Sequence, residues 1–125
     1  MAEGHEVYGL DNINGYYDVR LKHSRLGLLG IKADMLVQGK AIEGDKGLIF
    51  YYLDILEAPQ LNSLFAEVKP QSVIHLAAQA GVRHSIDNPQ SFIDSNIQGF
   101  FNILEACRRN PVEHLIYASS SSVYG

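Results

Sequence analysis

The chain closes with Leu115-Ile116-Tyr117-Ala118-Ser119-Ser120-Ser121-Ser122-Val123-Tyr124-Gly125, an apolar run that leads directly into four serines and a Val-Tyr-Gly. In a parallel α/β sheet, ligands bind at the carboxyl ends of the strands. A cluster of hydroxyl groups placed directly after a buried strand therefore predicts two things. We expect a strand near residues 114–118 and a candidate site where that strand ends.

Three further segments have the length and composition of strands: residues 6–11, 48–54 and 73–77. They are apolar and aromatic with little alternation, a pattern that favours parallel strands buried on both faces. Between them, apolar residues recur at helical spacing from Pro59 to Pro70 and again from Pro89 to Arg109, with Asn88 as the expected N-cap of the second helix. Strands separated by helices predict right-handed βαβ crossovers and an α/β fold with a Rossmann-like parallel sheet and flanking helices.

The region from residue 12 to residue 46 has a less regular pattern. Several leucines favour a helix in its first half, but four glycines interrupt the pattern, and we expect its second half to be a long loop.

Composition limits the class of protein. With 125 residues, 46% hydrophobic and 19% charged, the chain has apolar material for a single domain, expected to span residues 1–125. A net charge of -4, with ten Lys and Arg and no basic run, argues against nucleic acid or an anionic membrane as partner. Cys107 is the single cysteine, the apolar runs are short, and residues 1–5 lack signal-peptide features, so we expect a cytoplasmic protein.

Acidic residues close two of the predicted strands. Asp11 is placed to accept hydrogen bonds from both hydroxyls of an adenosine ribose and to repel a 2′-phosphate, which favours NAD over NADP. Alternatively, Asp11 and Asn12 form a turn, since both side chains readily bond their own backbone. Asp54 is a candidate partner for the adenine amino group, or else a capping or turn residue.

The segment from His75 to Ser85 reads His-Leu-Ala-Ala-Gln-Ala-Gly-Val-Arg-His-Ser. Small residues directly after a buried strand allow a flat ligand to approach the backbone, and Arg83 and Ser85 offer donors to a charged or hydroxylated substrate. A Gly/Ala-rich loop with a solvated arginine is the alternative for any one of these residues.

These motifs, in this order, resemble the extended short-chain dehydrogenase/reductase family, the NAD-dependent nucleotide-sugar epimerases and dehydratases. Within that family they look most like the UDP-glucuronate 4-epimerases. The resemblance covers nearly the whole chain through the segments 7–12, 16–19, 53–54, 73–85, 88–89 and 117–125.

The resemblance implies a role for each matching position. Ser120 corresponds to the catalytic hydroxyl that hydrogen-bonds the 4-oxygen of a UDP-sugar, and Arg83, Ser85 and Ser121 fall on the substrate side. The positions that match NAD contacts are Asp11, Asn12, Asp54, Ile55, Leu76, Ala77, Ala78, Gln79, Ser95, Ala118 and Ser119. No metal is expected, because the five histidines are scattered without ligand spacing.

Epimerisation fits better than dehydration. A sugar 4,6-dehydratase of this family needs an Asp-Glu pair after the catalytic hydroxyl residue, and Ser121 and Ser122 occupy those places. The family's Gly-rich turn and its Tyr-x-x-x-Lys do not occur in the 125 residues, so we expect a partial NAD-binding domain that is inactive alone. A 4,6-dehydratase-like fragment, completion by a separately encoded segment, and a non-catalytic nucleotide-binding or assembly module remain alternatives.

The family's sheet order makes the missing first strand central. Since an unpaired buried backbone group costs about 1 to 3 kcal/mol, we expect the strands near Val7 and Ile74 either to pair directly in a four-stranded sheet or to recruit a strand from another chain. Apolar sheet surface should be exposed or buried between copies, which predicts self-association.

Overall fold

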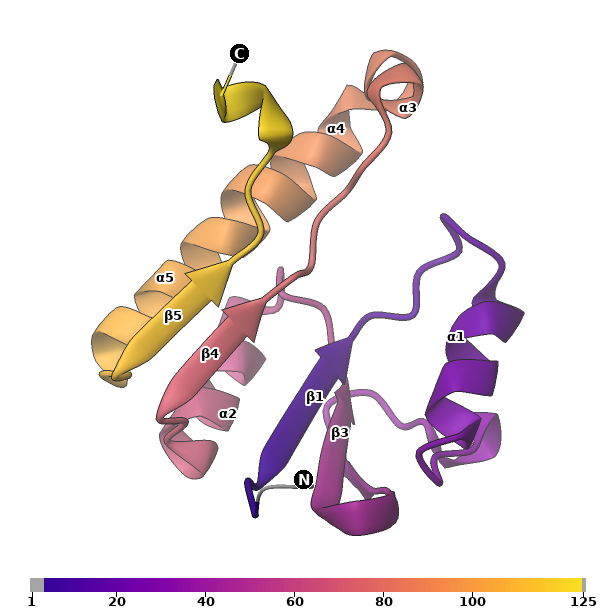
Figure 1. The fold of residues 1–125 in the computed structure, drawn as a ribbon, viewed down its shortest axis with the longest axis vertical. Coiled ribbons are helices and arrows are strands. Elements are labelled where there is room, and N and C mark those ends of the chain that lie inside the picture. Colours follow the sequence, from indigo (N-terminus) through magenta and orange to yellow (C-terminus); the bar gives the residue numbers. More distant parts are fainter. Residues whose placement is uncertain (1–3, 125) are drawn as a thin grey trace. The chain divides into compact units, whose positions relative to one another are not determined.

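A computed structural model describes residues 4–124, apart from the side chains of residues 121 and 122. The chain divides into two compact units, Met1–Asp54 and Ile55–Gly125, and each is described by itself. Within the described residues the strands form two sheets, one in each unit (Figure 1).

The first unit is built around a three-stranded sheet. Strand β1 (Val7–Asp11) runs parallel to β3 (Leu48–Tyr52), and the short β2 (Ala41–Glu43) pairs antiparallel with β3 on its other side. Because Asp11 stands opposite Tyr52, the carboxyl ends of β1 and β3 meet at the same edge. The core of this unit is aliphatic and aromatic, and its buried members are Ile31, Ile42, Leu48 and Phe50.

The region after β1 holds more structure than the sequence predicts. Helix α1 (Val19–Gly27) matches the leucine pattern, and Asp18 caps it by accepting a hydrogen bond from the backbone of Arg20. The expected long loop contains the 3₁₀ turns η1 (Ala33–Met35) and η2 (Asp45–Gly47) as well as β2. Strand β2 is too short for alternation to reveal it, and buried Ile42 anchors it to the core.

The second unit places two parallel strands beside helices. Strands β4 (Ser72–His75) and β5 (His114–Tyr117) pair in parallel, and α2 (Ala58–Val68) packs against α5 (Phe100–Arg109). The predicted strands and the helix that begins at Pro59 are therefore confirmed. A left-handed Lys69 (φ 48°) ends α2 directly before Pro70.

The second predicted helix forms over its full length but is not uniform. It begins as α4 (Pro89–Phe92), continues as a π-helical segment η3 (Ile93–Gly99) and ends as α5. Asn88 occupies the expected N-cap position before Pro89, but its side chain makes no capping hydrogen bond, and its backbone N–H donates to the His84 carbonyl. That bond closes α3 (Val82–Asp87), a helix missed because its exposed Val82 and Ile86 stand alone without a longer periodic pattern.

Strand β1 is hydrogen-bonded to β3 within the first unit, and β4 is hydrogen-bonded to β5 within the second. Direct pairing of β1 with β4 in a four-stranded sheet, and recruitment of a strand from another chain, both stay predictions.

Apolar sheet surface is exposed in the second unit, as expected. Ile74 and Ile116 stand opposite each other on β4 and β5, with 66% and 51% of their surface exposed. On the other face of the same two strands, His75 and Tyr117 both lie against Phe100 of α5.

Candidate functional site

The first unit brings three candidate residues together at the ends of β1 and β3. The Asn12 side chain donates from Nδ2 to Oδ2 of Asp54 over 2.7 Å, and the backbone N–H of Leu53 donates to the Asp11 carbonyl at 3.2 Å. The parallel register of β1 and β3 creates this arrangement, because both chains leave the sheet at the same level. The result is a polar edge with two carboxylates and one amide.

Asp11 takes part in the turn that the sequence offers as its alternative role. Its Oδ1 accepts from the backbone N–H of Ile13, a residue held at φ 47°, and Asn12 Oδ1 accepts from Asn14 N at 3.2 Å. Oδ2 of Asp11 forms no hydrogen bond within residues 4–124. The turn and a ligand-binding role are therefore compatible, since one oxygen holds the backbone and the other stays available as an acceptor.

Lys22 is a member of this site that sequence reasoning missed. Its Nζ lies 2.8 Å from Oδ1 of Asp11, in an ion pair that joins α1 to the end of β1. The sequence favours a helix that contains Lys22, and Asp18 caps it. Nothing in the sequence indicates that this helix folds back onto Asp11, so the sequence held no signal for the contact.

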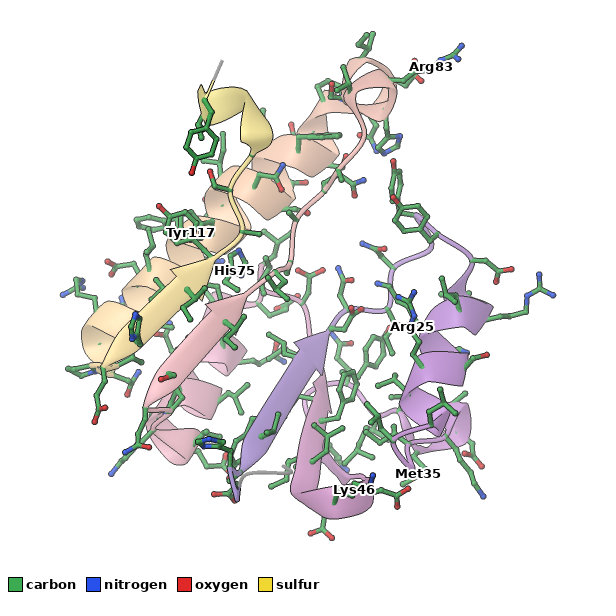
Figure 2. The ribbon with its side chains drawn as sticks, in the orientation of Figure 1. Arg25, Met35, Lys46, His75, Arg83 and Tyr117 are labelled. Atoms are coloured by element: carbon green, nitrogen blue, oxygen red, sulfur yellow. The ribbon has the colours of Figure 1, made fainter. Side chains whose placement is uncertain are left out.

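The second unit gathers its candidates where β4 and β5 end. The backbone N–H of Ala118 donates to the His75 carbonyl at 3.1 Å, which keeps the two chains side by side as they leave the sheet. Figure 2 shows His75 and Tyr117 at these neighbouring strand ends. The candidates that follow them directly are all exposed: Leu76, Ala77, Ala78, Ala118, Ser119 and Ser120.

Asn96 fixes the next part of the loop after β4. Its Oδ1 accepts from the backbone N–H of Gln79 at 2.8 Å, and its Nδ2 donates to the Gln79 carbonyl at 2.9 Å. This two-point contact buries Gln79 and brings the π-helical segment, with Ser95, beside the loop. Asn96 was missed because a polar residue inside a predicted helix is ordinarily assigned to its solvated face.

Ile55 lies in the core of the second unit. Its side chain packs on Gly99, where an added Cβ would come within 2.7 Å of Ile55 Cγ1. Its carbonyl accepts from Nδ2 of buried Asn102 at 2.9 Å. Ile55 is therefore held by packing against Gly99 of η3 and by a hydrogen bond from Asn102 of α5.

Two of the three residues expected on the substrate side, Arg83 and Ser85, lie on α3. Figure 2 shows Arg83 extending from α3 away from β4 and β5. Ser85 Oγ donates to the Val82 carbonyl within the same helix at 2.6 Å. Ser121 opens the 3₁₀ turn η4 (Ser121–Tyr124), but its side chain lies outside the described residues.

The titratable groups near the strand ends have structural roles. His75 stacks on Phe100 with ring centroids 5.3 Å apart, and burial lowers the pKa of its imidazole. Burial also raises the pKa of the Cys107 thiol on α5, which favours a packing role.

In residues 4–124 no three His, Cys, Asp or Glu side chains stand close enough to hold a metal ion. None of the helices in that range is long and apolar enough to cross a membrane.

All 125 residues of the chain match the model of a known protein family. The family model described as "NAD dependent epimerase/dehydratase family" covers residues 1–125. The chain belongs to this family. The Rossmann-like α/β fold and the family's dependence on NAD, both expected from the motifs, are thereby confirmed.

Curated relatives of this epimerase/dehydratase family member are similar along the whole chain. Protein CapI of Staphylococcus aureus is 46% identical over 125 residues, all of this chain and 33% of the relative. UDP-glucuronate 4-epimerase 3 of Arabidopsis thaliana is 46% identical over 123 residues, 98% of this chain and 25% of the relative. The chain thus spans a quarter to a third of the length of these relatives.

Solved structures of UDP-glucose 4-epimerases share the fold. A UDP-glucose 4-epimerase from Thermus thermophilus, in complex with NAD, aligns at a TM-score of 0.67 and 30% identity, covering 95% of this chain and 31% of that one. A UDP-glucose-4-epimerase from Stenotrophomonas maltophila, with bound NAD and formylated UDP-arabinopyranose, aligns at a TM-score of 0.71 and 27% identity. It covers 99% of this chain and 32% of that chain.

Proposed function

We propose that the chain is part of an NAD-dependent nucleotide-sugar 4-epimerase that acts on UDP-glucuronate or a close UDP-sugar. The observation that carries the proposal is the polar edge of Asp11, Asn12 and Asp54, where a carboxylate oxygen is available at the carboxyl end of β1. The similarity of the chain to UDP-glucuronate 4-epimerases supports the proposed substrate class.

The residues at the polar edge fit the adenosine half of NAD. A ribose diol presents two hydroxyl donors, and Asp11 supplies a charged acceptor that needs no further donor. Asn12 and Asp54 add an amide and a second carboxylate, which suit the polar rim of an adenine. Bound NAD would supply the group that takes a hydride from the sugar and returns it.

Ser120 is the proposed catalytic hydroxyl. Ser120 is exposed directly after β5, where the resemblance puts the catalytic hydroxyl, and a serine hydroxyl orients and polarises a sugar oxygen by hydrogen bonding. The exposed alanines after β4 allow a flat ring to approach the backbone. Arg83, Ser85 and Ser121 complete the proposal on the substrate side.

The proposal includes a cytoplasmic location and excludes elimination chemistry. The location is supported by the single cysteine, which offers no intramolecular disulfide. Serines at positions 121 and 122 are far weaker acids and bases than the carboxylates that a 4,6-dehydration requires. The second candidate function is a non-catalytic nucleotide-binding module. The polar edge would bind a nucleotide in this case too, and this function applies if the protein lacks a catalytic base.

Calorimetric titration with NAD, on protein expressed from its complete reading frame, tests the cofactor site. We expect saturable binding that Asp11→Ala weakens by about ten- to a hundredfold, because a hydrogen bond to a charged group is worth about 1.5 to 3 kcal/mol. The matched control is Asp34→Ala, which removes an exposed carboxylate from the same unit. Equal affinities for Asp11→Ala and Asp34→Ala would contradict the proposed site.

Product analysis separates the candidate functions. Incubation of the same protein with UDP-glucuronate and NAD, followed by NMR of the sugar, should give the C4 epimer with no loss of the C6 oxygen. A 4-keto-6-deoxy product from a UDP-hexose would instead indicate a dehydratase. Binding of NAD without turnover of either sugar would favour the non-catalytic module.

A further inference from the structure

The ion pair between Lys22 and Asp11 is the feature that the proposed function leaves unexplained. Lys22 Nζ lies 2.8 Å from Asp11 Oδ1, the oxygen that also accepts from the Ile13 backbone N–H. The Lys22 side chain is 25% exposed and that of Asp11 is 42% exposed. One of the two oxygens of the carboxylate that we propose to bind the ribose is therefore ion-paired with the Lys22 ammonium.

A second ion pair on the same helix provides a comparison. Arg20 pairs with Asp18, only two residues away, and their side chains are 87% and 52% exposed. That contact is local to the start of α1, whereas the Lys22 contact spans eleven residues and joins the helix to the end of β1. Of the two cations, Lys22 is therefore the one placed to affect chemistry at Asp11.

We propose that Lys22 is a specificity-determining residue that sets how strongly this site discriminates between NAD and NADP. The proposal rests on the proposed function. An unpaired carboxylate at this position accepts the ribose hydroxyls and repels a 2′-phosphate. A fixed ammonium 2.8 Å from that carboxylate offsets the repulsion. With Lys22 present, the preference of this site for NAD over NADP is therefore smaller than it would be with Asp11 and no neighbouring ammonium.

Removal of the ammonium should change the two affinities unequally. In Lys22→Met, the ratio of the Kd for NADP to the Kd for NAD should rise about three- to tenfold, because a partly exposed charge interaction is modest and a phosphate carries more than one charge. Lys22→Arg keeps the positive charge and should keep the ratio. Arg20→Met removes a cation from the same helix and should leave the ratio unchanged.

A double-mutant cycle tests the mechanism directly. Asp11→Ser removes the carboxylate, so the freed Lys22 should raise the affinity for NADP. The combination of Asp11→Ser with Lys22→Met should lose that gain. Thermal unfolding of every variant identifies any loss of affinity that comes from unfolding, and the expected ratios apply to variants that unfold like the wild type.

Calorimetry or fluorescence titration with both dinucleotides reads the outcome. The proposal is overturned if Lys22→Met and Arg20→Met give the same ratio, or if Asp11→Ser gains NADP affinity equally with and without Lys22. Failure of the proposed function looks different, because the wild-type protein would then bind neither dinucleotide.

Discussion

His75 lies at the carboxyl end of β4, where its ring stacks on Phe100 and the backbone carbonyl accepts from Ala118. The sequence predicts a core histidine here, since an isolated histidine inside an apolar strand has no ligand-spaced partner, and the stacking agrees. Burial disfavours the charged imidazolium, which is why the pKa of His75 is lowered from 6.5. The neutral ring is therefore part of the packing between β4 and α5.

This lowered pKa predicts a loss of stability in mild acid. As the pH falls below 6.5, the unfolded chain takes up the His75 proton before the folded chain does, so the free energy of unfolding decreases. Above that pH the contribution of His75 is constant. In His75→Phe, which keeps an aromatic ring against Phe100, Tm should fall less between about pH 7.5 and pH 5.5 than in the wild type.

Differential scanning fluorimetry across that pH range is the measurement. His114→Gln, a change at an exposed position of β5, serves as the control and should follow the wild-type curve. An acid-induced decrease in Tm that is the same in His75→Phe and the wild type would contradict a buried neutral histidine.

Helices long enough to repeat a hydrophobic pattern over several turns could be predicted from the sequence, whereas elements of only a few residues could not. Residues 59–69 and 89–109 carry several turns of helical periodicity between prolines, and the structure confirms both helices. Strand β2 has three residues and α3 has six, so neither repeats a pattern often enough to be recognised. The π-helical segment has no recognised signature in the sequence, and its contact with the loop after β4 is made by Asn96, which hydrogen-bonds to Gln79.

Gly99 gives a prediction at the scale of helix packing. An added Cβ would come within 2.7 Å of Ile55 Cγ1, and Ile55 is itself buried. Overpacking of this kind costs about 1 to 3 kcal/mol, so Gly99→Ala should lower the free energy of unfolding by that amount. The cost arises although alanine is intrinsically the better helix former.

Gly27→Ala is the matched control, since nothing lies within 4 Å of a Cβ built at Gly27 at the end of α1. That variant should be neutral or more stable by up to about 1 kcal/mol. Urea denaturation of both variants gives the comparison. If Gly99→Ala proved as stable as Gly27→Ala, the close packing of Ile55 on η3 would be wrong.

At the scale of the whole molecule, the sequence predicted the family and the strand ends but not how the site is held together. Asp11, Asn12 and Asp54 were correctly expected to follow neighbouring strands, and the structure joins two of them by a hydrogen bond. The contacts made by Lys22 and Asn96 depend on where helices fold back onto loops. No local pattern encodes such a long-range contact, so both residues were missed. The pairing of β1 with β3 and of β4 with β5 is found within each unit, and pairing of β1 with β4 stays a prediction.

The exposed pair Ile74 and Ile116 gives a prediction for a polypeptide limited to these 125 residues. Apolar cross-strand neighbours with more than half of their surface in water favour association, so this polypeptide should form dimers or larger species as its concentration rises. Ile74→Lys should shift the equilibrium toward the monomer, as measured by sedimentation velocity. Val82→Lys makes the same change on exposed α3 and should have no effect if the β4–β5 face is the contact. A wild-type polypeptide that stays monomeric at every concentration would refute self-association.

The π-helical segment also constrains how this region tolerates changes in length. Asn96 is anchored to Gln79 and Asn102 to Ile55, so the number of residues between the two anchors fixes the rotation of one relative to the other. Each residue of a regular α-helix turns the chain by about 100°. Deletion of one residue between the anchors would restore regular geometry while rotating Asn102 away from Ile55. Related sequences should therefore accept insertions and deletions in the loop before β2 far more readily than between residues 96 and 102.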